Sequence, residues 1–393
     1  MNEVMSPQRI SNWHRSNVLL FVFMGASWTA LATRMPVVKA DLGVTASQLG
    51  LILLGMGIGS LIGLNLIGRM IAKSGTKRWL MIFYPTLAGL VIINAMLIEN
   101  HLTIAYAVMA FLMGGLMGMT DVSVNVDGTA LEKATNRILM PRMHAGYSVG
   151  TLAGAGWGVL CASADLSLVW TVLPLGVIAF VLPFIVSKHL PSDIGIETAT
   201  PKQADAPKPA HWFSFTLVLF GLGILGITLA EGGAGDWMTL GFTEGYRTTP
   251  AQAGIGFALF FVGMVLVRFF GGNVADRIGK GRALQLFAAI GVVGVLLVIL
   301  GAPNLMLGWI GAALWGMGVA LGFPLFLSAA GEGENAAKRV GFVASWGYGA
   351  FLAGPPILGL LADQIGMLNM FFVIAGFVFV ALLVAGAAGS KRA

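Results

Sequence analysis

The sequence predicts an all-α membrane protein in which twelve transmembrane helices form two pseudo-symmetric six-helix bundles. Composition is the first reason: 57% of the 393 residues are hydrophobic and only 10% are charged, whereas a soluble domain carries about 25% charged residues. The second is a series of long apolar runs, since roughly 20 apolar residues cross a bilayer as a helix. The third is a polar motif that occurs at the same place in each half of the chain.

The apolar runs divide into two sets of six. In the first set we expect helices at 17–38, 47–68, 79–98, 102–128, 140–162 and 166–187. In the second set we expect them at 213–240, 252–271, 283–301, 304–329, 339–362 and 367–388. The segment between the sets contains four prolines among polar residues, which is typical of a linker. The predicted domains are an N-terminal bundle at 1–187, a cytoplasmic linker at 188–212 and a C-terminal bundle at 213–393.

The first apolar run follows Arg9 and Arg15 and ends near small residues, so it also resembles a signal peptide. Cleavage would leave eleven helices and destroy the pairing of the halves, so we interpret this run as a span. The single cysteine, Cys161, lies in an apolar run, which excludes a disulfide framework and a Cys-based metal site.

Basic residues predict the orientation. With a cytoplasmic N-terminus, 20 of the 23 Lys and Arg residues fall in cytoplasmic segments or at cytoplasmic helix ends, and the exceptions are Arg34, Lys39 and Arg247. The positive-inside rule then places both termini in the cytoplasm. Because the basic residues lie in short loops between spans, the net charge of +6 does not indicate nucleic-acid binding.

The repeated motif follows the second apolar run of each half. Its second copy has two glycines seven residues apart with an acid and a base between them: Gly272, Asp276, Arg277 and Gly279. The first copy, 204 residues upstream, keeps the glycines and the basic residues: Gly68, Lys73, Gly75 and Arg78. Ala72 stands where the second copy has its acid. One motif at equivalent places in both halves indicates a duplicated architecture.

The fourth predicted span carries small and polar residues on one helical face: Gly114, Gly118, Asp121, Asn125, Gly128 and Glu132. Ionisable groups at membrane depth are costly and usually face a cavity, so each is a candidate site. We expect Asp121 to accept a proton or to contact substrate, with Asn125 as a substrate contact. The alternative is that Asp121 lies near the cytoplasmic end and pairs with a loop cation such as Arg142.

The seventh span contains Glu231 and Asp236 with three glycines between them, followed by Trp237, and such a segment is a poor continuous helix. Broken helices mark midplane binding sites in transporters. We therefore expect Glu231 to carry a proton. Asp236 is predicted as a substrate contact, with a gate residue or a solvated end cap as alternatives. Arg34, near the outer end of the first span, is predicted to pair with Asp236 and to belong to the substrate site.

Aromatic rings complete the predicted substrate site, because partly apolar ligands stack on them. The candidates are Trp28, Trp237, Trp315 and Phe323. Tryptophans are also ordinary at membrane interfaces, and this alternative stays open.

The loop motif and the twelve-span pattern resemble the major facilitator superfamily, whose signature G-x-x-x-D-R-x-G-R/K lies between the second and third helices of each half. Within that superfamily, the segment from Asp121 to Asn125, with Glu132 and the Pro141-Arg142-Met-His144 run, is similar to YbjJ-type bacterial permeases. It is more distantly similar to the fucose permease branch. The resemblance implies a central cavity, alternating access, a gating role for the loop motif and Arg142, and capping of a helix across the bundle interface by Asp276.

Two departures narrow the predicted function. The fucose permease branch has an acid in the first helix that this chain lacks, and the drug-exporter branch has an arginine in the fourth helix that is absent here. The sequence contains no motif of a hydrolase, a zinc enzyme or a P-loop ATPase, so we expect no enzyme activity and no cofactor, with a proton gradient as the driving force.

The predicted function is proton-coupled symport of a small polar organic solute, with Asp121 and Glu231 carrying protons. A proton-coupled exporter of amphipathic compounds or drugs is the runner-up, and a non-transporting membrane receptor or scaffold is a third alternative. We expect a monomer in the bacterial inner membrane. Its partners would be a small-molecule substrate and the lipid bilayer, without nucleic acid.

Overall fold

A computed structural model describes residues 6–137, 139–196, 213–332 and 335–389, and every regular element in these ranges is a helix. The chain forms two compact units. Unit 1 comprises Met1–Gly43 and Ile52–Lys202, and unit 2 comprises Val44–Leu51 and Gln203–Ala393. Most of the predicted linker at 188–212 lies outside the described residues.

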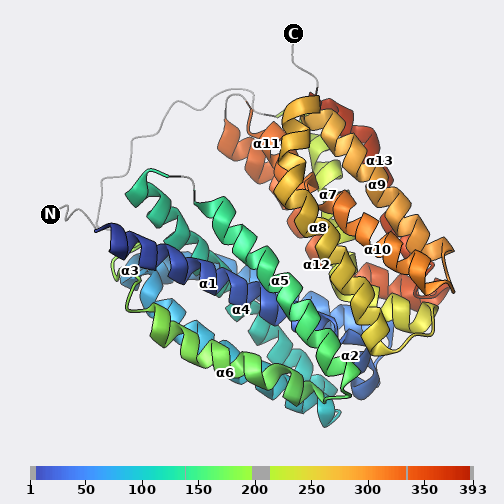
Figure 1. Ribbon diagram of the computed structural model, residues 1–393, viewed down its shortest axis with the longest axis horizontal. Coiled ribbons are helices and arrows are strands. Elements are labelled where there is room, and N and C mark those ends of the chain that lie inside the picture. The colour runs from blue at the N-terminus through green and yellow to red at the C-terminus, as the bar shows by residue number, and fades with distance from the viewer. Residues whose placement is uncertain (1–5, 138, 197–212, 333–334, 390–393) are drawn as a thin grey trace. The chain divides into compact units, whose positions relative to one another are not determined.

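Unit 1 contains the first six predicted spans (Figure 1). Its helices are α1 (Pro7–Ala32), α2 (Met35–Leu42), α3 (Ala46–Glu99, which belongs to this unit from Ile52 onward), α4 (Thr103–Thr135), α5 (Met140–Ser163) and α6 (Leu168–Val186). α1 and α2 are bent by 51° and form one broken span. α3 holds two spans, because Gly75 adopts a φ of 75° and a ψ of 163°, which no α-helix contains.

Unit 2 contains the other six. Its helices are α7 (Phe215–Leu240), the π-helix η1 (Gly241–Gly245), α8 (Pro250–Ile278), α9 (Lys280–Leu300), α10 (Leu305–Val319), α11 (Gly322–Ala330), α12 (Ala336–Ile365), α13 (Phe371–Val384) and the 3₁₀ helix η2 (Ala385–Gly389). α10 and α11 together cover the tenth predicted span. The predicted break in the seventh span is wrong, because α7 runs through its glycines without interruption. A Cβ on Gly233 would lie 2.6 Å from Ile374, so a neighbouring helix fills the space that a side chain would occupy.

The number of helices that can cross a membrane is consistent with the predicted number of spans. Among the described residues, eight helices are long and apolar enough to span a bilayer, and nine when the bent α1–α2 pair is one span. Division of α3 at Gly75 adds one more, and the glycine-rich helices α5 and α12 lie at the places of the two remaining predicted spans, which is consistent with twelve. The predicted all-helical membrane fold is confirmed.

Glycines let α5 approach α1 closely inside unit 1. A Cβ on Gly150 would lie 1.9 Å from the carbonyl oxygen of Val22, and one on Gly154 would lie 2.1 Å from that of Ala26. Distances this short are far inside van der Waals contact, so only glycine fits. The glycine spacing of the fifth span therefore serves packing within its own bundle.

The first turn of α3 belongs to unit 2, where Asp363 near the end of α12 caps it. The Ala46 amide donates to Asp363 Oδ1 at 3.0 Å, and the Ser47 amide donates to Oδ2 at 2.8 Å. These amides have no acceptor within their own helix, and a carboxylate also stabilises the positive end of the helix dipole.

Candidate functional site

The two copies of the loop motif share one backbone conformation. Gly75 has a φ of 75° and a ψ of 163°, and Gly279 has a φ of 84° and a ψ of 153°. Side chains with a Cβ rarely adopt such a positive φ, which explains why glycine stands at this position in both copies.

The residue after each of these glycines bonds to an acid near the end of the fourth helix of its bundle. In unit 1, Thr76 Oγ1 donates to Asp127 Oδ1 at 3.1 Å. In unit 2, Lys280 Nζ pairs with Glu332 at 2.6 Å and donates to Ser328 Oγ at 2.9 Å. The repeat therefore extends from sequence to contacts, although the donor in unit 1 is a neutral hydroxyl group and not an ammonium group.

The other predicted gating residues lie at the surface of their units. Lys73, Arg78, Arg142, Asp276 and Arg277 are exposed, and the Arg78 guanidinium lies 5.8 Å from the Trp79 ring centre. A Cβ on Gly68 or Gly272 would have no neighbour within 4 Å. Capping by Asp276 across the bundle interface would join the two units, and it stays a prediction.

Asp121 and Asn125 form a polar pair on α4. Asn125 Nδ2 donates to the Asp121 backbone carbonyl at 2.9 Å and to Asp121 Oδ1 at 3.2 Å. Asp121 is exposed in unit 1, and among the described residues it forms no ion pair with Arg142. Glu132, on the same predicted stripe, instead caps α5, because its Oε1 accepts the Leu139 amide at 2.6 Å and the Met140 amide at 2.8 Å.

Asp127 is a buried acid on α4 that the sequence analysis missed. It has no exposed surface, and its Oδ2 accepts hydrogen bonds from Trp13 Nε1 and Asn17 Nδ2, both at 2.6 Å. Thr76 supplies the third donor, so the carboxyl group has three neutral partners and no cationic one in the part of the chain that the structure describes. The sequence signal that could have revealed this site is the pair Trp13 and Asn17, which lie four residues apart on one face of α1. Two buried hydrogen-bond donors require an acceptor.

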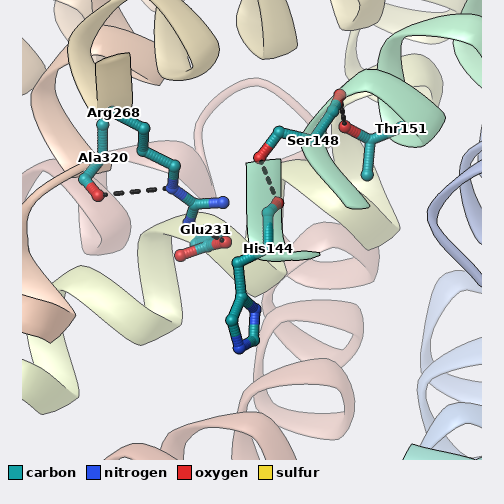
Figure 2. Close-up of polar contacts among 6 residues, drawn as sticks. All are labelled: His144, Ser148, Thr151, Glu231, Arg268 and Ala320. Atoms are coloured by element: carbon teal, nitrogen blue, oxygen red, sulfur yellow. Dashed lines mark hydrogen bonds and ion pairs between the residues drawn. The ribbon is translucent and has the colours of Figure 1, made fainter. Parts of the chain in front are cut away.

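The clearest charged site in the described part of unit 2 joins Glu231 on α7 to Arg268 on α8 (Figure 2). Arg268 Nη2 lies 3.0 Å from Glu231 Oε1, and the two side chains are 33% and 29% exposed. Arg268 Nε also donates to the Ala320 carbonyl oxygen at 3.4 Å. The guanidinium group is thus held by a carboxylate on one helix and by backbone at the break between α10 and α11.

Proline explains why the Ala320 carbonyl is open to a side chain. In a continuous helix this carbonyl would accept the amide of the residue four positions later, which is Pro324 and has no N–H. The Arg268 guanidinium therefore takes the place of the missing backbone donor. The position of Arg268 differs from our prediction, which placed this residue at the cytoplasmic end of a helix. α8 continues to Ile278, ten residues or about 15 Å beyond Arg268.

Asp236 lies at a separate small cavity between α7 and α12. Glycines, apolar side chains and Pro355 form the rest of its wall. The cavity volume is only about 10 Å³, which is room for about one water molecule, so the cavity fits no organic solute. Arg34 belongs to unit 1, where its Nη2 donates to the Leu166 carbonyl at 2.6 Å. Its predicted pairing with Asp236 joins the two units and stays a prediction.

The predicted aromatic contacts differ in accessibility. Trp237 and Trp315 are completely buried in unit 2, and Trp315 packs edge-on against Phe260 and Phe371. Both indoles are therefore core residues in this conformation. Trp28 and Phe323 are half-buried.

Polar side chains on α5 bond to backbone within unit 1. Ser148 Oγ donates to the His144 carbonyl at 3.2 Å, and Thr151 Oγ1 donates to the Ser148 carbonyl at 2.7 Å (Figure 2). Thr29 on α1 donates to the Thr151 carbonyl at 2.7 Å. These hydroxyl groups are satisfied locally and serve the packing of α5 on α1. In the described ranges, no three His, Cys, Asp or Glu side chains gather in a way that could hold a metal ion.

Comparison with known proteins gives the same architecture. The family model described as the Major Facilitator Superfamily matches residues 18–333. The chain is 31% identical to an uncharacterised MFS-type transporter of Yersinia pestis, and the match covers 96% of this chain and 94% of that protein.

Two solved structures share the fold. The nucleoside transporter NupG aligns with a TM-score of 0.77 at 12% identity, covering 97% of this chain and all of that one. The E. coli fucose:proton symporter FucP aligns with a TM-score of 0.61 at 16% identity, covering 98% of this chain and all of that one. Because the family and the bacterial relative that the chain matches are membrane transporters, the chain is a multi-pass protein of the inner membrane and not an enzyme. It is a transporter that belongs to the Major Facilitator Superfamily.

Proposed function

We propose that this protein imports a small polar organic solute by proton-coupled symport, with Asp121 and Glu231 as the proton-binding groups. The observation that carries the proposal is the ion pair between Glu231 and Arg268, which lies within two membrane helices. A partly exposed ion pair contributes only about 0–1 kcal/mol to stability, so stability alone does not explain its presence. Ionisable groups inside a membrane protein more often mark a substrate or ion pathway.

Asp121 supports the same proposal from unit 1. Its carboxyl group is exposed and, among the described residues, its one side-chain partner is the neutral Asn125. A carboxyl group without a fixed cation can gain and lose a proton without breaking an ion pair. A polar solute also agrees with the names of the two structural neighbours, one a fucose:proton symporter and the other a nucleoside transporter.

We also propose a monomer with both termini in the cytoplasm, working by alternating access of its two units. The distribution of Lys and Arg residues supports this orientation. Most of them still fall on the predicted cytoplasmic side when Arg268 is not counted there.

The test uses purified full-length protein in liposomes that contain a pH-sensitive dye. Sugars, organic acids, amino acids, nucleosides and lipophilic cations are added outside in turn, and counterflow of labelled solute is measured in parallel. Symport predicts that a polar solute acidifies the lumen and that Asp121→Asn and Glu231→Gln abolish the acidification. Asp193→Asn is the control, because Asp193 is an exposed carboxylate in the loop after α6. Lumenal alkalinisation, or a response to lipophilic cations alone, would instead indicate an exporter.

A further inference from the structure

The free donors of Arg268 indicate which chemical class of solute the site takes. A guanidinium group has five N–H donors. Among the described residues, Arg268 uses one for the Ala320 carbonyl and one for Glu231 Oε1. Its side chain is one-third exposed, so the remaining donors are accessible. A planar fork of such donors matches the two oxygens of a carboxylate better than any neutral group.

The Ala320 contact keeps this fork in place independently of Glu231. It depends on Pro324, which removes the backbone donor that would otherwise occupy the Ala320 carbonyl. If Glu231 moved away, the guanidinium group would still be held through Nε. Arg268 is therefore preorganised to accept a second carboxylate in the place of the first.

The charge balance then links the exchange to a proton. If a solute carboxylate replaced Glu231 while Glu231 stayed ionised, one carboxylate would be left without a cation inside the membrane, which is strongly unfavourable. Protonation of Glu231 removes this penalty. One monoanion and one proton then enter together, and the net charge of the site is zero before and after binding.

We propose that the transported solute is an organic monocarboxylate, which displaces Glu231 from Arg268 as Glu231 takes up one proton. The inference rests on the proposed proton-coupled transport and deepens it by naming the solute class. It predicts that the exchange at Glu231 is electroneutral, because the charges of the solute and of the proton taken up there cancel.

Few other groups can supply the proton or the charge. On the elements packed against α7, the helices α10, α11 and α13 and the 3₁₀ helix η2 carry no titratable residue in the described part of the chain. The remaining titratable groups on α7, η1, α8 and α12 are Asp236, Glu244, Asp276, Arg277, Lys338, Arg339, Tyr348 and Asp363. None of them contacts Glu231 in the described structure, whose one side-chain partner is Arg268.

The experiment measures binding to the purified full-length protein between about pH 5 and about pH 8. The probes are gluconate, galacturonate, lactate and pyruvate at millimolar concentration, each beside a neutral analogue: sorbitol, galactose, lactamide or pyruvamide. We expect at least one carboxylate to bind at least about tenfold more tightly than its analogue. Its affinity should fall by up to about tenfold per pH unit as the pH rises, because each bound anion brings one proton.

Two variants separate the role of Arg268 in carboxylate binding from the role of Glu231 in proton uptake. Arg268→Gln should weaken carboxylate binding by roughly 100-fold, since a bidentate charged contact is lost. Glu231→Gln should keep the binding and remove its pH dependence. Asp193→Asn, which changes an exposed carboxylate in the loop after α6, is the control and should leave the affinity and its pH dependence unchanged.

Each contrary result overturns the inference. Two such results concern the wild type: a carboxylate and its neutral analogue bind equally tightly, or no carboxylate binds at all. The other two are wild-type carboxylate affinity in Arg268→Gln and pH-dependent carboxylate binding in Glu231→Gln. If a neutral solute is accumulated by a pH gradient, the carboxylate inference fails while proton-coupled symport stands. If a carboxylate binds as described but no pH gradient drives its accumulation, the proposed function fails while the site assignment stands.

Discussion

Removal of the Asp127 carboxyl group should destabilise unit 1, and its contacts set the size of the effect. Asp127→Ala leaves Trp13 Nε1 and Asn17 Nδ2 without their acceptor, and both side chains are buried. Each buried unsatisfied donor costs about 1–3 kcal/mol, so the loss should be about 2–6 kcal/mol. Asp127→Asn should cost less than about 1.5 kcal/mol, because the amide oxygen can accept both donors and the amide N–H can donate to the Thr76 hydroxyl.

The measurement is thermal unfolding of the purified variants in one detergent, followed by tryptophan fluorescence. For a unit of this size, 1 kcal/mol shifts the Tm by about 2–4 °C, so Asp127→Ala should lower the Tm by about 4 °C or more. Asp127→Asn should stay within about 6 °C of the wild type. A wild-type Tm for Asp127→Ala, or equal losses in both variants, would refute the assignment of Asp127 as the shared acceptor.

Three further predictions concern packing, backbone and capping. Gly150→Ala should destabilise the protein by about 1–3 kcal/mol, since its Cβ would lie 1.9 Å from a carbonyl oxygen. Gly156→Ala on the same helix has open space and should be neutral or slightly stabilising in the same thermal assay. Gly75→Ala should cost more than Gly279→Ala, because both have a positive φ but only Gly75 also lies against a backbone oxygen, at 2.5 Å from its Cβ. Asp363→Ala should lose about 0.5–2 kcal/mol by uncapping α3, and unchanged hydrogen exchange in the first turn of α3 would contradict that assignment.

The sequence alone predicted the architecture because long apolar runs and a duplicated motif depend on local composition. Gly75 and Gly279 are an example: the motif that contains them indicated a duplicated architecture, and the two glycines have the same backbone conformation. The continuity of α7 was not predictable from helix propensity. Propensity scales describe peptides in water, whereas in α7 side chains of neighbouring helices lie against Gly232 and Gly233.

The candidate site was only partly predictable, because pairing between helices depends on their rotation and length. Asp121 and Glu231 stand out as acids within apolar runs. Asp127 lies on the other face of α4, and its partners are more than 50 residues away in the chain. Arg268 was assigned to a helix end because the apolar run stops at 271, while the helix itself continues to Ile278.

The most direct test of proton coupling at Glu231 compares two measurements. One is the accumulation of solute driven by a pH gradient, and the other is counterflow in the absence of a pH gradient. Both are measured in liposomes with the wild-type protein and with Glu231→Gln. We predict that the variant keeps counterflow and loses accumulation, since it still binds and moves solute but has no carboxyl group to protonate. Accumulation by Glu231→Gln at the wild-type level would contradict the assignment of this residue as a proton carrier.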